Sequence, residues 1–185
     1  MKKVALIGSG NAFFKDEGIG LYAAKYIKEN YHFDENHLEI VDGGTLGFKL
    51  MPLLQEFDTV FIVNTASDES REVGEISVKT TDEFLDGSLV KKTANEVEIA
   101  EMLQICSMAN SVAETVVISI VPEDIIAVEV SLSDKLRESW HAYIGITVEK
   151  LQDEGILLEK KEQEVTLDDI LHIFANPSIE HSRGF

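Results

Sequence analysis

The chain has 185 residues, of which 44 % are hydrophobic and 27 % charged, and this is enough for one domain with a substantial buried core. Its net charge of −18 would repel a phosphate backbone, so we expect no nucleic-acid partner. Every apolar run falls short of the roughly 20 residues that a membrane helix needs, and residues 4–7 are too few for the core of a secretory signal. The single cysteine, Cys106, agrees with a reducing compartment, so we expect a cytoplasmic protein with no membrane partner.

The first half of the chain alternates between apolar strands and amphipathic helices. Residues 4–7 predict a buried strand, residues 18–29 a helix and residues 38–41 a second strand. A second helix is predicted over 46–54, and its internal proline is expected to break or kink it. The third strand, over 59–63, is the most apolar one and is therefore expected near the centre of the sheet.

The second half continues the same alternation. The alternating polarity of residues 75–79 predicts a half-exposed strand near an edge of the sheet. Residues 95–109 predict a helix, residues 115–121 a buried strand, and Ser133 the cap of a long helix. Because strands and helices alternate, we expect a three-layer α/β fold. Its mostly parallel, twisted sheet of about five strands would carry helices on both faces.

The sequence predicts two parts of unequal size. Residues 1–154 are expected to form the α/β domain, and residues 155–185 a C-terminal extension. In the extension, residues 156–161 predict one more strand. Thr166 and Asp169 have the spacing of a capping box that opens a short helix, which is followed by a frayed end.

The most informative segment is the glycine-rich loop 8–20 after the first strand. It begins like a dinucleotide-binding fingerprint, but Phe13 stands where the third glycine would allow close helix–strand packing. Asp16 and Glu17 at the start of the following helix would repel a pyrophosphate. A nucleotide-binding domain therefore remains only a remote alternative.

Ligands of open α/β sheets bind outside the carboxyl ends of the strands. Glu17, Asp42 and Asn64 all fall at this edge of the predicted sheet. Asp16 has a second explanation, because a carboxylate at a helix N-terminus complements the helix dipole. We therefore place the functional cleft around the loop 8–20, at the carboxyl ends of the first and third strands.

Two glycine-rich motifs carry a family resemblance. The first loop reads G-S-G-N, then four residues, then D-E-G-I-G over 16–20; the second strand ends in D-G-G-T-L-G over 42–47. Together with the strand 58–64, the segment 117–123 and residues 132–133 at the start of a long helix, they resemble the hydrogenase maturation proteases, or HybD-like peptidases. The resemblance covers about residues 3–154. The cleft residues that we single out are Asn11, Asp16, Glu17, Asp42, Gly43, Gly44, Thr45 and Asn64.

The resemblance implies a substrate and a way to recognise it. Members of the family remove a C-terminal extension from the large-subunit precursor of nickel–iron hydrogenase after the metal has been inserted. No cofactor is expected to be bound permanently; nickel is presented by the substrate. Three protease groups reach that nickel in the family, namely a carboxylate in the first loop, an Asp after the third strand and a His before a later helix.

These three positions fall on Glu17, Asn64 and Asn95, and only Glu17 has the matching residue type. Ni²⁺ favours imidazole and tolerates carboxylate, whereas an amide oxygen is a weak ligand. We therefore expect an altered metal-recognition site, for which Asp68 and Glu69 are candidates to supply a substitute oxygen.

Two functional hypotheses follow. The first is an endopeptidase that processes a hydrogenase large-subunit precursor, with altered or absent dependence on metal. The second is a non-catalytic homologue that binds such a precursor, or an assembly partner, without cleaving it; Asn64 and Asn95 motivate this alternative. The sequence assigns no residue as the group that attacks the peptide bond.

Overall fold

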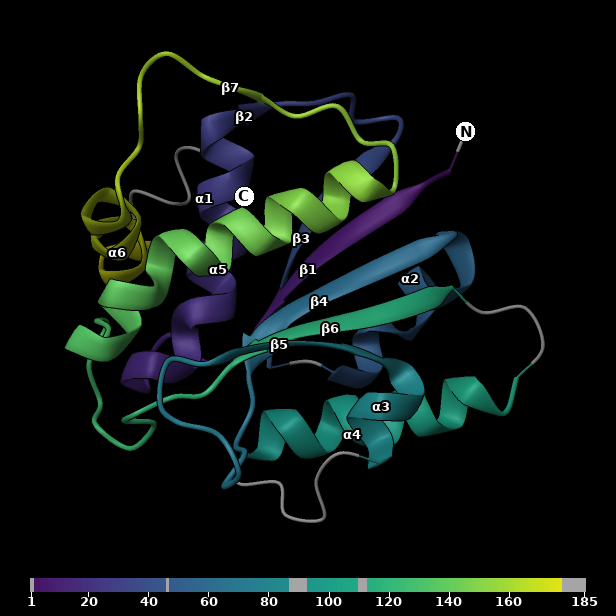
Figure 1. Cartoon of the computed structure of the whole chain (residues 1–185), viewed down its shortest axis with the longest axis horizontal. Helices are drawn as coiled ribbons and strands as arrows, with labels where there is room; N and C mark the ends of the chain where they lie inside the picture. The colour runs from purple at the N-terminus through teal and green to yellow at the C-terminus, as the bar shows by residue number, and fades with distance from the viewer. Residues whose placement is uncertain (1, 46, 87–92, 110–112, 178–185) are drawn as a thin grey trace.

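The computed structural model describes residues 2–45, 47–86, 93–109 and 113–177. Its main sheet consists of β1 (Val4–Ser9), β3 (Leu38–Gly44), β4 (Thr59–Thr65), β5 (Ile76–Thr80) and β6 (Glu114–Ile120). The order across the sheet is β3-β1-β4-β6-β5, and only β5, at the edge, runs antiparallel to its neighbour. The predicted α/β fold and its mostly parallel sheet are therefore confirmed (Figure 1).

Helices cover both faces of this sheet. In chain order they are α1 (Ile19–Asn30), α2 (Met51–Glu56), α3 (Thr81–Asp86), α4 (Ala94–Ser107), α5 (Asp134–Asp153) and α6 (Leu167–Ala175). The short 3-10 helices η1 (Lys15–Gly18) and η2 (Gly47–Leu50) precede α1 and α2. Helices α1 and α5 pack on one face, whereas α2, α3 and α4 pack on the other (Figure 1). Within the described residues, no helix has both the length and the apolar character to span a membrane.

The parallel register brings the carboxyl ends of the central strands together. Strand β4 lies between β1 and β6, which confirms the central position predicted for the third strand. Near its end, Val63 lies opposite Gly8 of β1, and Asn64 lies opposite Ser119 of β6. Loops that leave these strands must therefore meet at one edge of the sheet, which is where the motifs fall.

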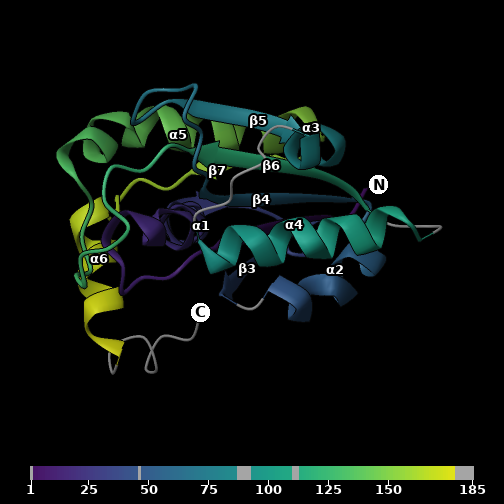
Figure 2. The same ribbon diagram turned by 90° about the horizontal axis from the view of Figure 1, so that it is seen from below.

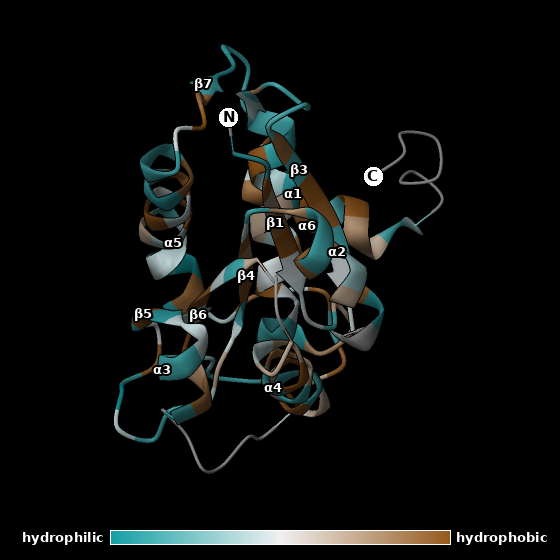
Figure 3. Cartoon of the chain, turned by 90° about the vertical axis from the view of Figure 1, so that its right-hand side faces the viewer, coloured by the Kyte–Doolittle hydropathy of each residue, from teal (hydrophilic) through white to brown (hydrophobic). Residues whose placement is uncertain are grey.

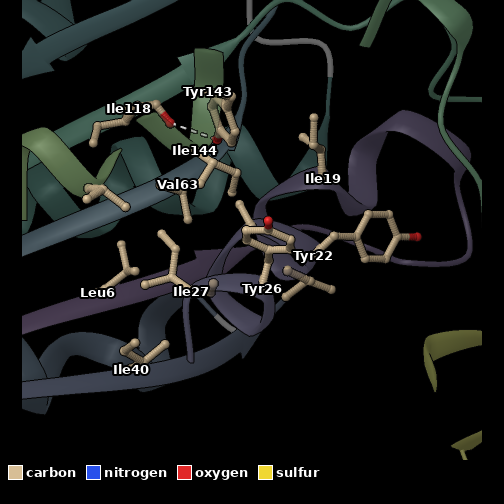
Figure 4. Close-up of a cluster of buried hydrophobic side chains, with 14 of the residues drawn as sticks. Leu6, Ile19, Tyr22, Tyr26, Ile27, Ile40, Val63, Ile118, Tyr143 and Ile144 are labelled. Carbon is tan, nitrogen blue, oxygen red and sulfur yellow. Dashed lines mark hydrogen bonds between the residues drawn. The ribbon is translucent and has the colours of Figure 1, made fainter. Parts of the chain in front are cut away.

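Alternating side chains of the strands fill two hydrophobic clusters, one on each face. The larger cluster joins Leu6 and Val63 to side chains of α1 and α5, as Figure 4 shows. In this cluster the hydroxyl of Tyr143, which is fully buried, lies 3.0 Å from the carbonyl oxygen of Asn64 and 3.1 Å from that of Ile118. The apolar colouring of β1 in Figure 3 agrees with the burial of this strand.

The extension after α5 folds back along α1. Strand β7 (Glu159–Lys160) pairs antiparallel with β2 (Tyr31–His32), so this strand is shorter than the one predicted over 156–161. The side chain of Asn30 also receives the backbone N–H of Val165 at 2.8 Å.

Helix α6 opens at the capping box that Thr166 and Asp169 predict. It lies beside α1 (Figure 2), where Phe174 packs edge-on against Tyr22 with ring centroids 5.1 Å apart. The extension thus shares the larger core cluster with the rest of the chain. The frayed end that we predicted lies outside the described residues.

The segment before β4 differs from the prediction of one helix over 46–54. Helix η2 ends at Leu50 and α2 begins at Met51, so Pro52 occupies the first turn of α2. A proline costs no hydrogen bond there, because the first N–H groups of a helix have no partner within it. The predicted helix is thus divided into η2 and α2, and the division lies just before Pro52.

Gly20, in the first turn of α1, fits only because it has no side chain. A Cβ there would lie 2.2 Å from the carbonyl oxygen of Val63 and 2.6 Å from that of Ser9. We expect Gly20→Ala to destabilise the fold by about 3 kcal/mol, because both oxygens belong to the central strands.

Gly145→Ala in α5 is the matched control, since its Cβ would meet no described atom within 4 Å. It should raise the stability by up to about 1 kcal/mol, the difference in helix propensity. Denaturant unfolding measures both changes, and equal stability of Gly20→Ala and wild type would contradict this account.

Candidate functional site

A cleft of about 730 Å³ lies next to the carboxyl end of β1. It is formed by the loop between β1 and α1, the turn after β3, the start of α4, and the connection between β6 and α5. The lining residues that matter for its chemistry are Asn11, Glu17, Thr45, Asn95, Glu98 and Ile126. Among the described lining residues, none is Lys, Arg or His.

Glu17 is a buried acid that lines this cleft. Glu17 belongs to η1, and only 8 % of its surface is exposed. Gly10, at φ +146°, allows the loop to pass close to the carbonyl oxygen of Glu17, which accepts the N–H of Asn11 at 3.3 Å. Burial, with a smaller contribution from the carboxylate of Glu96, raises the pKa of Glu17 above its ordinary value. A cation that entered the cleft would therefore gain free energy by pairing with this carboxylate.

Asn95 faces the same cleft from the start of α4. The helix opens at Thr93, whose hydroxyl accepts the N–H of Glu96 while the Glu96 carboxylate accepts the N–H of Thr93. This capping box places Asn95 in the first turn, 5 % exposed, with its Nδ2 2.9 Å from the Oγ of Ser9. The amide therefore ties α4 to the end of β1 and lies at the cleft wall.

Asn64 lies deeper than the other two positions. Its side chain is fully buried at the end of β4, and its Oδ1 accepts the hydroxyl of Ser119 at 2.6 Å. Its Nδ2 finds no hydrogen-bond partner in the described part of the chain, which is uncommon for a buried donor. The structure thus brings Glu17 and Asn95 together in one cleft and places Asn64 in the sheet layer, beside Ser119.

Asp16 does not share the position that we expected for it in the cleft. Its fully buried carboxylate accepts the N–H groups of Glu123, Asp124 and Ser133 at 3.0, 2.9 and 2.7 Å. It also accepts the hydroxyl of Ser133 at 2.8 Å. Asp16 therefore joins the first loop to the connection between β6 and α5. This connection contains Ile126, which lines the cleft.

The turn after β3 contributes to two hollows. Thr45 lines the cleft together with Asn11, and both residues also line an adjoining hollow with Asp42 and Gly44. Asp42 accepts the N–H of Gly44 at 2.9 Å, which stabilises the turn. Gly43 is needed for packing, because a Cβ there would lie 2.9 Å from the carbonyl oxygen of Gly8.

The described residues contain no group of three or more His, Cys, Asp or Glu side chains arranged to hold a metal ion. Asp68, one of the two candidates for a substitute oxygen, pairs with Arg71 at 3.3 Å. Hydrogen bonds from Ser70 lower the pKa of the Asp68 carboxyl.

Sequence reasoning missed several residues of the site. Ser9 and Ser119 hold the two amides, and Glu98 and Ile126 line the cleft. The sequence could have identified Ser9 as a site residue, because it lies inside the first motif beside the cleft glycines. The indication for Ile126 is weaker: it is an apolar residue in a connection without helical or strand periodicity.

We expect Asp16→Asn to lower the stability by about 3 kcal/mol, because it replaces one carboxylate oxygen with an NH2 group, which cannot accept a hydrogen bond from the buried N–H groups. Asp34→Ala is the control: this exposed carboxylate accepts the backbone N–H of Asn36 at 2.9 Å, and its loss should cost about 1 kcal/mol or less. Urea unfolding compares the two, and similar losses would contradict the structural role of Asp16.

Glu17→Gln should raise the melting temperature at pH 7. The raised pKa means that the folded protein binds this proton more tightly than the unfolded chain, whose ordinary value is 4.5. Stability is therefore lost as the pH rises from 4.5 through the raised pKa, and the variant avoids that loss.

Below pH 4.5 the two melting temperatures should converge. Glu56→Gln, at the exposed end of α2, controls for the loss of one negative charge. A Glu17→Gln protein that melts below the wild type throughout this range would overturn the electrostatic account of the site.

Comparisons with known proteins identify the family of this chain. Over residues 21–150 the sequence matches the family HycI, described as hydrogenase maturation protease. Protein HydD of Wolinella succinogenes is 24 % identical over 153 residues, which cover 81 % of this chain and 95 % of HydD. The hydrogenase expression/formation protein HoxM of Azotobacter vinelandii is 24 % identical over 156 residues, with 83 % and 74 % covered.

Solved structures show the same fold. The hydrogenase maturating endopeptidase HybD from E. coli superposes with a TM-score of 0.75 at 17 % identity, covering 86 % of this chain and 98 % of HybD. The [NiFe] hydrogenase maturation protease HybD from Thermococcus kodakarensis gives a TM-score of 0.65 at 20 % identity, covering 80 % and 98 %. The family match spans most of the sheet and its helices, and the chain belongs to the hydrogenase maturation protease family.

Proposed function

We propose that this protein is an endopeptidase that removes the C-terminal extension of a nickel–iron hydrogenase large-subunit precursor. The observation that carries the proposal is the buried carboxylate of Glu17 in a cleft whose described lining holds no cationic side chain. Family membership supplies the reaction class. The raised pKa of Glu17 supports a site in which a bound cation would stabilise the buried carboxylate.

Nickel enters this proposal as part of the substrate. Glu17 supplies the one carboxylate at the three positions of the resemblance, and Asn64 and Asn95 supply amides that are already hydrogen-bonded to serines. A single carboxylate holds Ni²⁺ weakly, so contacts with the precursor polypeptide carry a larger share of the affinity. The expected dependence on nickel is therefore smaller than a site with a His and two carboxylates would give.

The direct experiment incubates the protein with a nickel-loaded large-subunit precursor and measures the precursor by intact-mass spectrometry. We expect a mass loss at its C-terminus. Glu17→Gln should lower kcat/KM at least tenfold, or about 1.4 kcal/mol, whereas Glu56→Gln should stay close to the wild type. An unchanged mass with every cognate precursor would end the peptidase proposal.

A second candidate, a homologue that binds the precursor without cleaving it, is favoured by the two amides. The Oδ1 of Asn95 accepts the hydroxyl of Ser9 at 3.2 Å and the Oδ1 of Asn64 accepts the hydroxyl of Ser119 at 2.6 Å, so both amide oxygens are already hydrogen-bonded. The double variant Asn64→Asp with Asn95→His restores the ligand types of the family. Cleavage by this variant alone would favour the binding role, and cleavage by the wild type would exclude it.

A further inference from the structure

A second hollow, of about 400 Å³, adjoins the cleft. Its walls come from opposite ends of the chain, because the first loop supplies Phe13 and the C-terminal extension supplies Phe174 and Pro177. Phe13 is 64 % exposed, which is unusual for an aromatic side chain in a region that is otherwise packed. The hollow therefore offers an open apolar surface at the molecular face that bears the cleft.

The two hollows share an edge. Asn11 and Thr45 line both of them, so a polypeptide that occupies the cleft beside Glu17 lies next to the second hollow. The second hollow is therefore placed to contact whatever the cleft holds.

The wall from the extension is held firmly. Phe174 packs edge-on against Tyr22, and the capping box of Thr166 and Asp169 fixes the start of α6. A preformed apolar wall binds a side chain without first losing its own conformational freedom. The family match ends at residue 150, so this wall lies beyond the part of the chain that the match covers.

The charge of the lining residues limits which kind of polypeptide segment can bind in the two hollows. The two hollows carry the carboxylates of Glu17, Asp42 and Glu98, and their described lining contains no Lys, Arg or His. A segment with acidic side chains would be repelled, whereas an apolar segment free of acidic side chains meets no such penalty.

We propose that the second hollow is a subsite for a large apolar side chain of the precursor polypeptide, next to the part of the precursor that enters the cleft. The subsite is built by Phe13, Phe174 and Pro177, so the C-terminal extension of this protein takes part in substrate selection. This inference rests on the proposed function, since it assigns a second contact to the same substrate.

The test measures the affinity of the nickel-loaded large-subunit precursor for wild type and variants by calorimetric titration. Phe13→Ser should raise Kd about tenfold, because it removes an aromatic contact from the subsite. Phe13 is exposed, so this variant should fold like the wild type. Leu157→Ser, at an 84 % exposed position of the extension, is the matched control and should change Kd less than twofold.

A precursor in which one apolar side chain near the processing point is replaced by serine completes a double-mutant cycle. Coupling between that replacement and Phe13→Ser supports the subsite. If the wild type binds the precursor and Phe13→Ser binds it equally well, the subsite is wrong while the proposed function stands. If the wild type neither binds nor cleaves any cognate precursor, both proposals fall together.

Discussion

The geometry of the site depends on one buried carboxylate that belongs to a structural residue. Asp16 accepts three backbone N–H groups and one hydroxyl from the segment between β6 and α5. That segment also runs alongside the first loop through backbone hydrogen bonds, among them Lys15 N–H to the carbonyl of Glu129 at 2.9 Å. Since three otherwise orphaned N–H groups end on Asp16, the loop and the connection have little freedom to separate. The cleft is consequently defined before any substrate arrives.

Two neighbouring acids therefore have opposite surroundings. Asp16 is fully compensated by donors, whereas the adjacent Glu17 lies in a cleft with the carboxylate of Glu96 as an electrostatic neighbour. The hydrogen bonds of Asp16 keep Glu17 in its unfavourable buried position, because a loose loop would let Glu17 turn towards water. Such pairs of acids with contrasting environments are typical of functional sites.

Patterns of neighbouring residues in the sequence predicted the features that short-range interactions determine. Strand and helix periodicity gave the α/β architecture, and the glycine-rich loop correctly placed Glu17 at the edge of the sheet. The contacts that these patterns could not predict depend on distant partners. Asp16 finds its donors 107 to 117 residues further along, and Asn64 finds Ser119 55 residues further along. No periodicity encodes such pairings, so a carboxylate that looked like a cleft residue became a structural one. Pro52 shows the same limit at short range, because a proline predicts an interruption but not on which side the helix forms.

The position of α6 has a consequence for how substitutions in this chain are interpreted. Phe174 shares a hollow with Phe13 of the first loop, although 161 positions of sequence separate them. A change in α6 can therefore alter the surface next to the first loop while every residue of that loop stays the same.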